Sequence, residues 1–112
     1  MPPDDVWLRH MLDAARKVIA FSHGRSRSDL ETDEKLALAI VRLLEIVGEA
    51  AKQVAADTRT AHPEIPWREI AGTRDRLVHG YFEVDLDVVW SIVTGDLPGL
   101  VKSLETILRS GA

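Results

Sequence analysis

A long apolar stripe with a helical period constrains this fold more than any other feature of the sequence. From Asp33 to about Ala56, apolar residues recur at steps of three and four, which places them on one face of an α-helix about 35 Å long. Gly48 interrupts this stripe. Because an interior glycine costs about 1 kcal/mol relative to alanine, we expect another backbone to approach closely there. The stripe consists of Leu36, Ile40, Leu43, Val47, Ala50 or Ala51, and Val54.

Three more segments have helical spacing. Residues 22–28 are rich in glycine and serine and are expected to form the loop after the first of these segments. Val88–Val93 is β-branched and also suits a strand, but its helical period continues beyond it, so we expect a helix. The expected helices run from about Asp5 to Phe21, from Trp67 to about Val78 with Gly80 as the stop, and from about Asp85 onward, kinked or divided at Thr94–Pro98.

Length and composition limit both the architecture and the chemistry. The 112 residues suit one domain, residues 1–112, folded as an all-α, up-and-down bundle of four to five helices. The absence of cysteine excludes disulfides, zinc–thiolate sites and thiol chemistry. No apolar run approaches the roughly 18–20 residues of a membrane span. The acidic start lacks the pattern of a signal peptide, so we expect a cytoplasmic protein.

Charge is distributed unevenly along the chain. The net charge of −4 argues against broad, charge-driven coating of nucleic acid. Between Arg9 and Arg27, however, five basic residues stand against Asp13 alone, whereas five acidic and two basic residues follow from Glu83 to the end. The first stretch predicts either a local anion site or an ordinary solvated surface, and charge asymmetry alone does not separate the two.

The residues best suited to catalysis cluster between Gly72 and Tyr81. Arg74 and His79 are five residues apart, or about 140° on an ideal helix, so they share a face only if the helix ends before Gly80. This pair suits cleavage of the RNA backbone. A histidine accepts the proton of a ribose 2′-hydroxyl near neutral pH, and an arginine binds phosphate oxygens and the charge that builds in the transition state. The chemistry implies no metal and no cofactor.

A structural interpretation fits the same residues. One arginine and one histidine at a helix end are common in proteins. Arg74 would then pair with Asp75 or another carboxylate, and His79 would cap the helix C-terminus, where a positive charge is favourable. Spacing alone therefore leaves both interpretations open.

The wider sequence around this pair resembles a known family. Arg74, His79 and Tyr81 resemble the Arg-x4-His-x-Tyr motif of HepT toxins, which belong to the HEPN superfamily of ribonucleases. The similarity covers nearly the whole chain and is most specific between Gly48 and Trp90. The runs that carry it are Ile46–Ala51, Pro66–Gly72 and Tyr81–Trp90.

The resemblance implies a specific activity and a set of partners. Such proteins are small helical homodimers in which both motifs face one cleft, and they cleave RNA without a metal. They pair with an MNT-type nucleotidyltransferase antitoxin, which in some members transfers AMP to the motif tyrosine. Carried over, Arg74 would bind the phosphate, and His79 would be the base or, from the second subunit, the acid. Tyr81 would accept AMP, with Asp75 and Arg76 as supporting residues.

One position departs from the family pattern. HepT toxins often have asparagine after the motif arginine, where this chain has Asp75. A negative charge there opposes phosphate binding, although it can also orient Arg74 or favour the protonated form of His79. Two hypotheses follow: an RNA-cleaving toxin, or a non-catalytic helical module that binds, regulates or is modified by a nucleotidyltransferase. The intact motif favours the first, and the acidic composition together with Asp75 favours the second.

Overall fold

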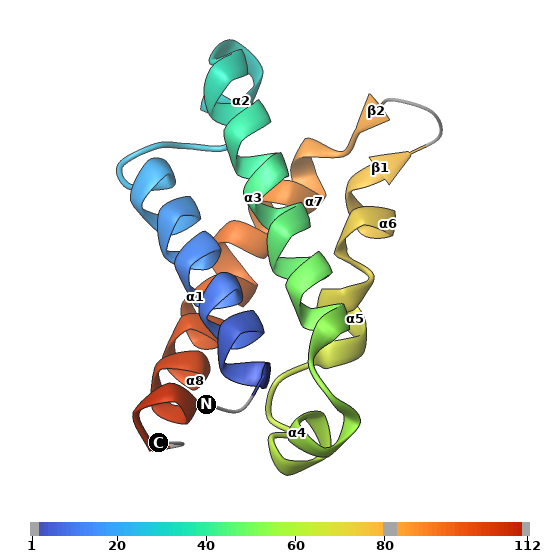
Figure 1. Cartoon of the computed structure of the whole chain (residues 1–112). Helices are drawn as coiled ribbons and strands as arrows, with labels where there is room; N and C mark the ends of the chain where they lie inside the picture. Colours follow the sequence, from blue (N-terminus) through green and yellow to red (C-terminus); the bar gives the residue numbers. More distant parts are fainter. Residues whose placement is uncertain (1–2, 80–82, 111–112) are drawn as a thin grey trace.

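Helices that lie side by side make up most of the structure (Figure 1). The computed structural model describes residues 3–79 and 83–110. Within these ranges, the long helices are α1 (Pro3–Ser22), α3 (Glu34–Gln53) and α8 (Leu97–Ser110). The shorter elements are α2 (Asp29–Thr32), α4 (Ala56–Ala61), α5 (Trp67–Ala71), α6 (Thr73–Leu77), β1 (Val78–His79), β2 (Glu83–Val84), α7 (Leu86–Ser91) and the π-helical turn η1 (Ile92–Asp96).

One apolar core holds these helices together. α1 packs along α3 and against α8, while α5 and α6 also pack on α3. Most buried side chains come from the apolar stripes of the sequence, and burying each large one contributes about 1.5–3 kcal/mol. In α3, however, the buried leucine is Leu44, and the predicted Leu43 is only partly buried against the core. The all-α bundle is therefore confirmed, with one small strand pair added. No helix in the described ranges is long and apolar enough to cross a membrane. Fully buried side chains include Leu8, Met11, Ile40, Leu44, Leu97 and Leu104.

The two longest predicted helices lie close to their expected positions. α1 covers the whole predicted segment from Asp5 to Phe21. Asp33 caps α3, because its carboxylate accepts the Leu36 N–H at 3.1 Å. α3 ends at Gln53 rather than Ala56, because Val54 adopts an extended backbone (φ −70°, ψ 132°) and buries its side chain.

The third predicted helix, Trp67–Val78, is divided in two, so the expectation of a single helix is wrong. The division falls at Gly72, whose backbone (φ −88°, ψ 12°) leaves the helical region and whose residue type has low helix propensity. The Thr73 hydroxyl donates to the Ile70 carbonyl at 2.6 Å and occupies an acceptor that a continuous helix would use. The second part, α6, ends at Leu77, and the chain continues as β1.

The fourth predicted helix begins and divides as expected. Asp85 caps α7, because its carboxylate accepts two backbone N–H groups of the first turn, each at 3.1 Å. The predicted break at Thr94–Pro98 takes the form of η1, in which the Leu97 N–H bonds to the Ile92 carbonyl five residues back. Pro98 has no N–H with which to continue an α-helical pattern, which explains the wider turn before it.

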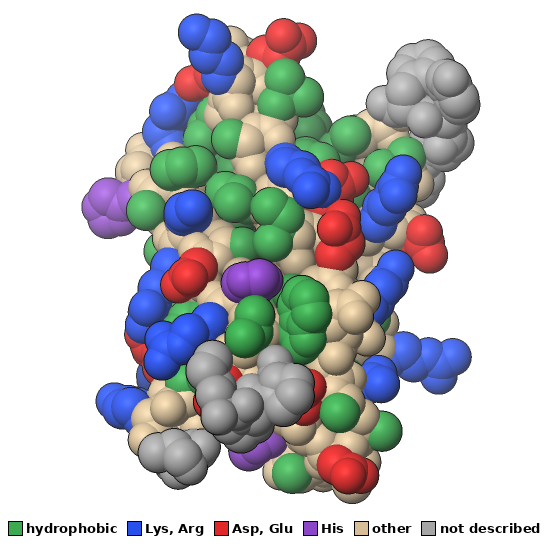
Figure 2. All heavy atoms as spheres, in the orientation of Figure 1, with side chains coloured by type: hydrophobic (Ala, Val, Ile, Leu, Met, Phe, Trp, Pro, Cys, Tyr) green, Lys and Arg blue, Asp and Glu red, His purple; other side chains and the backbone are tan. Residues whose placement is uncertain are grey.

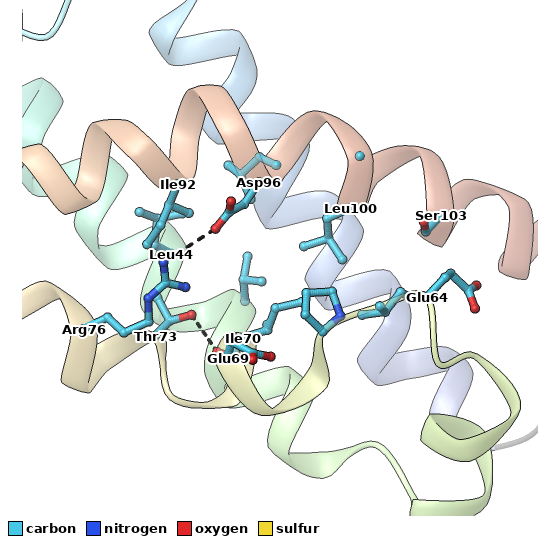
Figure 3. A pocket seen from close by; sticks show the side chains of 15 residues that line it. Leu44, Glu64, Glu69, Ile70, Thr73, Arg76, Ile92, Asp96, Leu100 and Ser103 are labelled. Carbon is cyan, nitrogen blue, oxygen red and sulfur yellow. Dashed lines mark hydrogen bonds and ion pairs between the residues drawn. The ribbon is translucent and has the colours of Figure 1, made fainter.

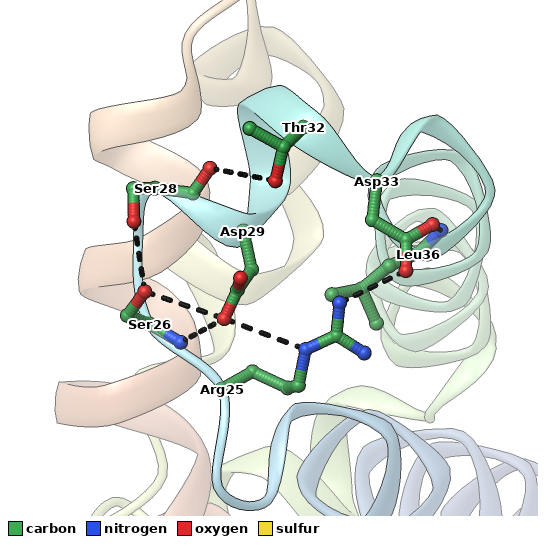
Figure 4. Close-up of polar contacts among 7 residues, drawn as sticks. All are labelled: Arg25, Ser26, Ser28, Asp29, Thr32, Asp33 and Leu36. Atoms are coloured by element: carbon green, nitrogen blue, oxygen red, sulfur yellow. Dashed lines mark hydrogen bonds and ion pairs between the residues drawn. The ribbon is translucent and has the colours of Figure 1, made fainter.

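Exposed ion pairs and hydrogen bonds fix the loop between α1 and α2 (Figure 4). Asp29 accepts the Ser26 N–H at 2.7 Å, and Asp33 accepts from the Arg25 guanidinium at 2.9 Å. The Ser26 amide lowers the pKa of Asp29. The Arg25 guanidinium, with the Leu36 amide, lowers the pKa of Asp33. Both carboxylates therefore hold their charge more strongly in the folded chain than in the unfolded one.

We expect this cluster to make the fold less stable in acid. Because the folded pKa values are lowered, the unfolded chain binds more protons below about pH 4, and the stability contributed by these groups is lost as the pH falls. Thermal unfolding between about pH 7 and pH 3 measures the effect. The double variant Asp29→Asn, Asp33→Asn keeps the helix cap and should show a shallower fall in Tm than the wild type. An equally steep fall would contradict the prediction.

Candidate functional site

α6 presents three charged side chains in succession to solvent. Thr73 and Leu77, four residues apart, are buried on the core side and anchor the helix. The residues between them, Arg74, Asp75 and Arg76, are all exposed. On a helix, Arg74 and Arg76 are about 200° apart and lie on opposite flanks, with Asp75 directed away from the core.

A close backbone contact at Gly48 fixes the position of α6 on α3. A Cβ atom on Gly48 would lie 2.9 Å from the Ile70 carbonyl oxygen and 3.3 Å from the Cβ atom of Thr73. The expected close approach of another backbone is therefore confirmed. Because Thr73 directly precedes Arg74, this glycine sets how near the motif arginine lies to the core.

The backbone changes from helix to strand between Arg74 and His79. α6 ends at Leu77, slightly earlier than predicted, so the two motif residues do not share a continuous helix. β1 pairs antiparallel with β2, with His79 opposite Glu83. The Asp85 N–H donates to the Leu77 carbonyl at 2.7 Å and closes the base of this ladder. For His79 the description is limited to the backbone.

Arg74 and Arg76 differ in their partners. Within residues 3–79 and 83–110, neither Arg74 nor the adjacent Asp75 forms an ion pair, which argues against the interpretation that the two neutralise each other. Arg76 pairs with Asp96 of η1 at 3.7 Å. Both groups are partly exposed, so this pair contributes about 0–1 kcal/mol and chiefly connects α6 to η1. Tyr81 lies outside the described residues.

A largely apolar cavity of about 250 Å³ lies beside α6 (Figure 3). Buried side chains such as Leu44 and Leu100 line it, and the Arg76–Asp96 ion pair borders one end. Glu64 lies toward the other end. The sequence does not predict this cavity or the role of Asp96, because the lining comes from segments that are far apart along the chain.

Known proteins similar to this chain are ribonucleases by name. The chain matches the family described as "HepT-like: Ribonuclease HepT-like" over residues 11–107. It is 40% identical over 103 residues to a Thermococcus cleftensis protein named "Probable ribonuclease HepT", a match that covers 92% of this chain and 94% of that protein. It is 39% identical over 103 residues to a protein of Caldanaerobacter subterraneus subsp. tengcongensis, provisionally named an RNase, with 92% of each chain covered. No solved structure matches the chain significantly. The chain therefore belongs to the ribonuclease HepT-like family.

Proposed function

We propose that this chain is the toxin of a toxin–antitoxin pair and acts as a metal-independent endoribonuclease. The observation that carries the proposal is Arg74, exposed and without an ion-pair partner in the described part of the chain, on a helix that ends before His79. Membership of the ribonuclease HepT-like family and the ribonuclease names of the relatives support RNA as the substrate.

Arg74 binds the scissile phosphate in this mechanism. Its guanidinium donates to phosphate oxygens and remains charged throughout, so it stabilises the additional negative charge of the transition state. Arg76 supports it indirectly, because its ion pair with Asp96 connects α6 to η1. Asp75 adds a negative charge beside the phosphate and so moderates the strength of binding.

His79 transfers the protons. As general base it removes the proton of the ribose 2′-hydroxyl, and the 2′-oxygen attacks the adjacent phosphorus while the bond to the 5′-oxygen breaks. The departing 5′-oxygen takes a proton from His79 of a second protomer, so a homodimer with both motifs in one cleft supplies base and acid. The products are a 2′,3′-cyclic phosphate and a 5′-hydroxyl.

An MNT-type nucleotidyltransferase is the proposed antitoxin. Transfer of AMP to the Tyr81 hydroxyl would place a bulky, negatively charged group two residues after His79 in the sequence. That group would repel the RNA phosphate and obstruct the site, which explains how the modification silences the toxin.

A second candidate function is a non-catalytic helical module that binds, or is modified by, a nucleotidyltransferase. The exposed Asp75 beside Arg74 and the net charge of −4 favour it, because both oppose the approach of RNA. The two functions share a partner and differ in whether RNA is cleaved.

Incubation of the purified wild-type chain with RNA in the presence of EDTA tests the proposal. We expect cleavage without a divalent metal, and 2′,3′-cyclic phosphate at the product ends. Analytical ultracentrifugation of the same sample should give a dimer. A folded, dimeric and unmodified protein that leaves RNA intact would favour the partner-binding module, whereas a monomer at micromolar concentration would contradict the shared cleft.

A further inference from the structure

Three arginine side chains line a groove between α1 and α8. The end of the bundle where α8 finishes lies opposite the β1–β2 ladder (Figure 1). Lys and Arg side chains gather over these helices along the lower left edge of Figure 2. We call this surface the α1–α8 groove, and its volume is about 270 Å³. It is lined by Arg9, Leu12 and Arg16 of α1 and by Glu105, Leu108 and Arg109 of α8.

Four of the five basic residues between Arg9 and Arg27 fall into two groups in the structure. Arg25 and Arg27 each pair with two carboxylates of neighbouring segments, so their charges are compensated. Arg9 and Arg16 instead face α8 and contribute to the groove. Of the two interpretations of this stretch, a local anion site would therefore lie in the α1–α8 groove.

Positive charge prevails in the groove. Three guanidinium groups and one carboxylate line it, and Arg16 donates to Glu105 at 2.6 Å. Arg9 and Arg109 have no ion-pair partner within the described ranges 3–79 and 83–110. Among the described residues, the groove thus keeps two arginines without an ion-pair partner, on a chain whose net charge is −4.

We propose that the α1–α8 groove binds the phosphodiester backbone of an RNA that extends from the candidate site. This inference rests on the proposed ribonuclease function. Arginine suits the ligand because its planar guanidinium donates to two phosphate oxygens at once. Leu108, which is only partly buried, provides an apolar surface against which a ribose or base can pack. RNA also carries a phosphate at every nucleotide, so it can satisfy several arginines of one groove together.

Glu105 allows a second test, in which a substitution in the groove should raise the affinity for RNA instead of lowering it. Its carboxylate occupies Arg16 and repels phosphate, so it lowers the affinity for RNA. Glu105→Gln should bind RNA about threefold more tightly, given the usual strength of exposed ion pairs. The double variant Arg9→Gln, Arg109→Gln should bind about tenfold more weakly. A groove with only a structural role predicts no gain from Glu105→Gln.

Fluorescence anisotropy with labelled RNAs of about 4 and about 16 nucleotides, the range of single-strand binding sites, tests the proposal. A His79→Ala background prevents cleavage during the titrations. We expect the chain that carries only His79→Ala to bind the longer RNA more tightly than the shorter one. The double variant in the same background should lose most of this gain in affinity. The slope of log affinity against log salt concentration should also become shallower by about 0.7 for each phosphate that the double variant no longer binds. Lys52→Gln removes one exposed charge from α3 and is the control that should retain the gain.

The proposal would be overturned if affinity rose equally with RNA length in the double variant and in the chain that carries only His79→Ala. An acidic protein surface would then be the better candidate ligand of the groove. A Glu105→Gln variant that binds RNA no more tightly would also overturn it. Failure of the proposed function has a different signature, because the wild-type chain with His79 intact would then cleave neither RNA. Melting curves without RNA show whether the double variant, which keeps the Arg16–Glu105 pair, is folded.

Discussion

Alanine in place of His79 is expected to lower the rate of RNA cleavage by about 100- to 10,000-fold, because the 2′-hydroxyl loses its proposed general base. Arg74→Ala should lower the rate by about 100- to 1,000-fold through the loss of transition-state charge stabilisation. Both variants should melt close to the wild type, since Arg74 is exposed and His79 lies in a two-residue strand. Initial rates on one RNA and circular dichroism melts measure the two effects.

Arg68→Ala is the matched control for the loss of a positive charge. Arg68 is exposed on α5, the helix next to α6, and its replacement should leave most of the cleavage rate intact. Equal losses in Arg68→Ala and Arg74→Ala would point to general attraction of RNA instead of a specific phosphate ligand. Full activity in His79→Ala would contradict its role as the base.

Gly48→Ala is expected to destabilise the fold, although the same change in an open helix stabilises it by about 1 kcal/mol. The added Cβ would lie 2.9 Å from the Ile70 carbonyl oxygen, and a backbone atom cannot move aside as a side chain can. Separating α3 from α5 and α6 should cost about 1–3 kcal/mol, the usual range for overpacking. For a chain of this size that corresponds to a Tm lower by roughly 4–12 °C.

The same substitution should also reduce RNA cleavage, because displacement of Thr73 displaces Arg74. Gly99→Ala is the matched control. Gly99 lies in α8, and apart from its chain neighbours and its own helix backbone no described atom lies within 4 Å of a Cβ atom built on it, so alanine there should stabilise the fold by up to about 1 kcal/mol. Differential scanning calorimetry of both variants measures the contrast. A Gly48→Ala variant that melts at or above the wild-type temperature would contradict the close contact.

The long helices could be predicted because residues within each helix determine where it begins and which face is buried. Asp33 and the apolar stripe after it specify the start and the buried face of α3, and Pro98 specifies the break that becomes η1. α4 depends instead on a partner that is remote in sequence. It begins where the carboxylate of Asp4 accepts the Ala55 N–H at 3.2 Å and the Thr58 hydroxyl at 2.5 Å. No local pattern encodes such a contact.

Parts of the candidate site could also be predicted. The cost of Gly48 inside a helix indicates the close contact, and the spacing of the motif requires a helix that ends before Gly80. The Arg76–Asp96 ion pair and the α1–α8 groove could not be predicted. Each joins segments whose proximity comes from tertiary packing and leaves no periodicity or motif in the sequence.

The motif is divided between α6 and β1, so the proposed phosphate ligand and the proposed base lie on elements that can move independently. Arg74 is held to the core through the buried residues Thr73 and Leu77. His79 belongs instead to a ladder of two residue pairs, and its hydrogen bonds contribute only about 1 kcal/mol each. The distance between the proposed base and the phosphate ligand can therefore change without any rearrangement of the core. In the proposed mechanism, a partner that binds the ladder from outside would stop proton transfer by His79 while phosphate binding by Arg74 and the fold stay intact.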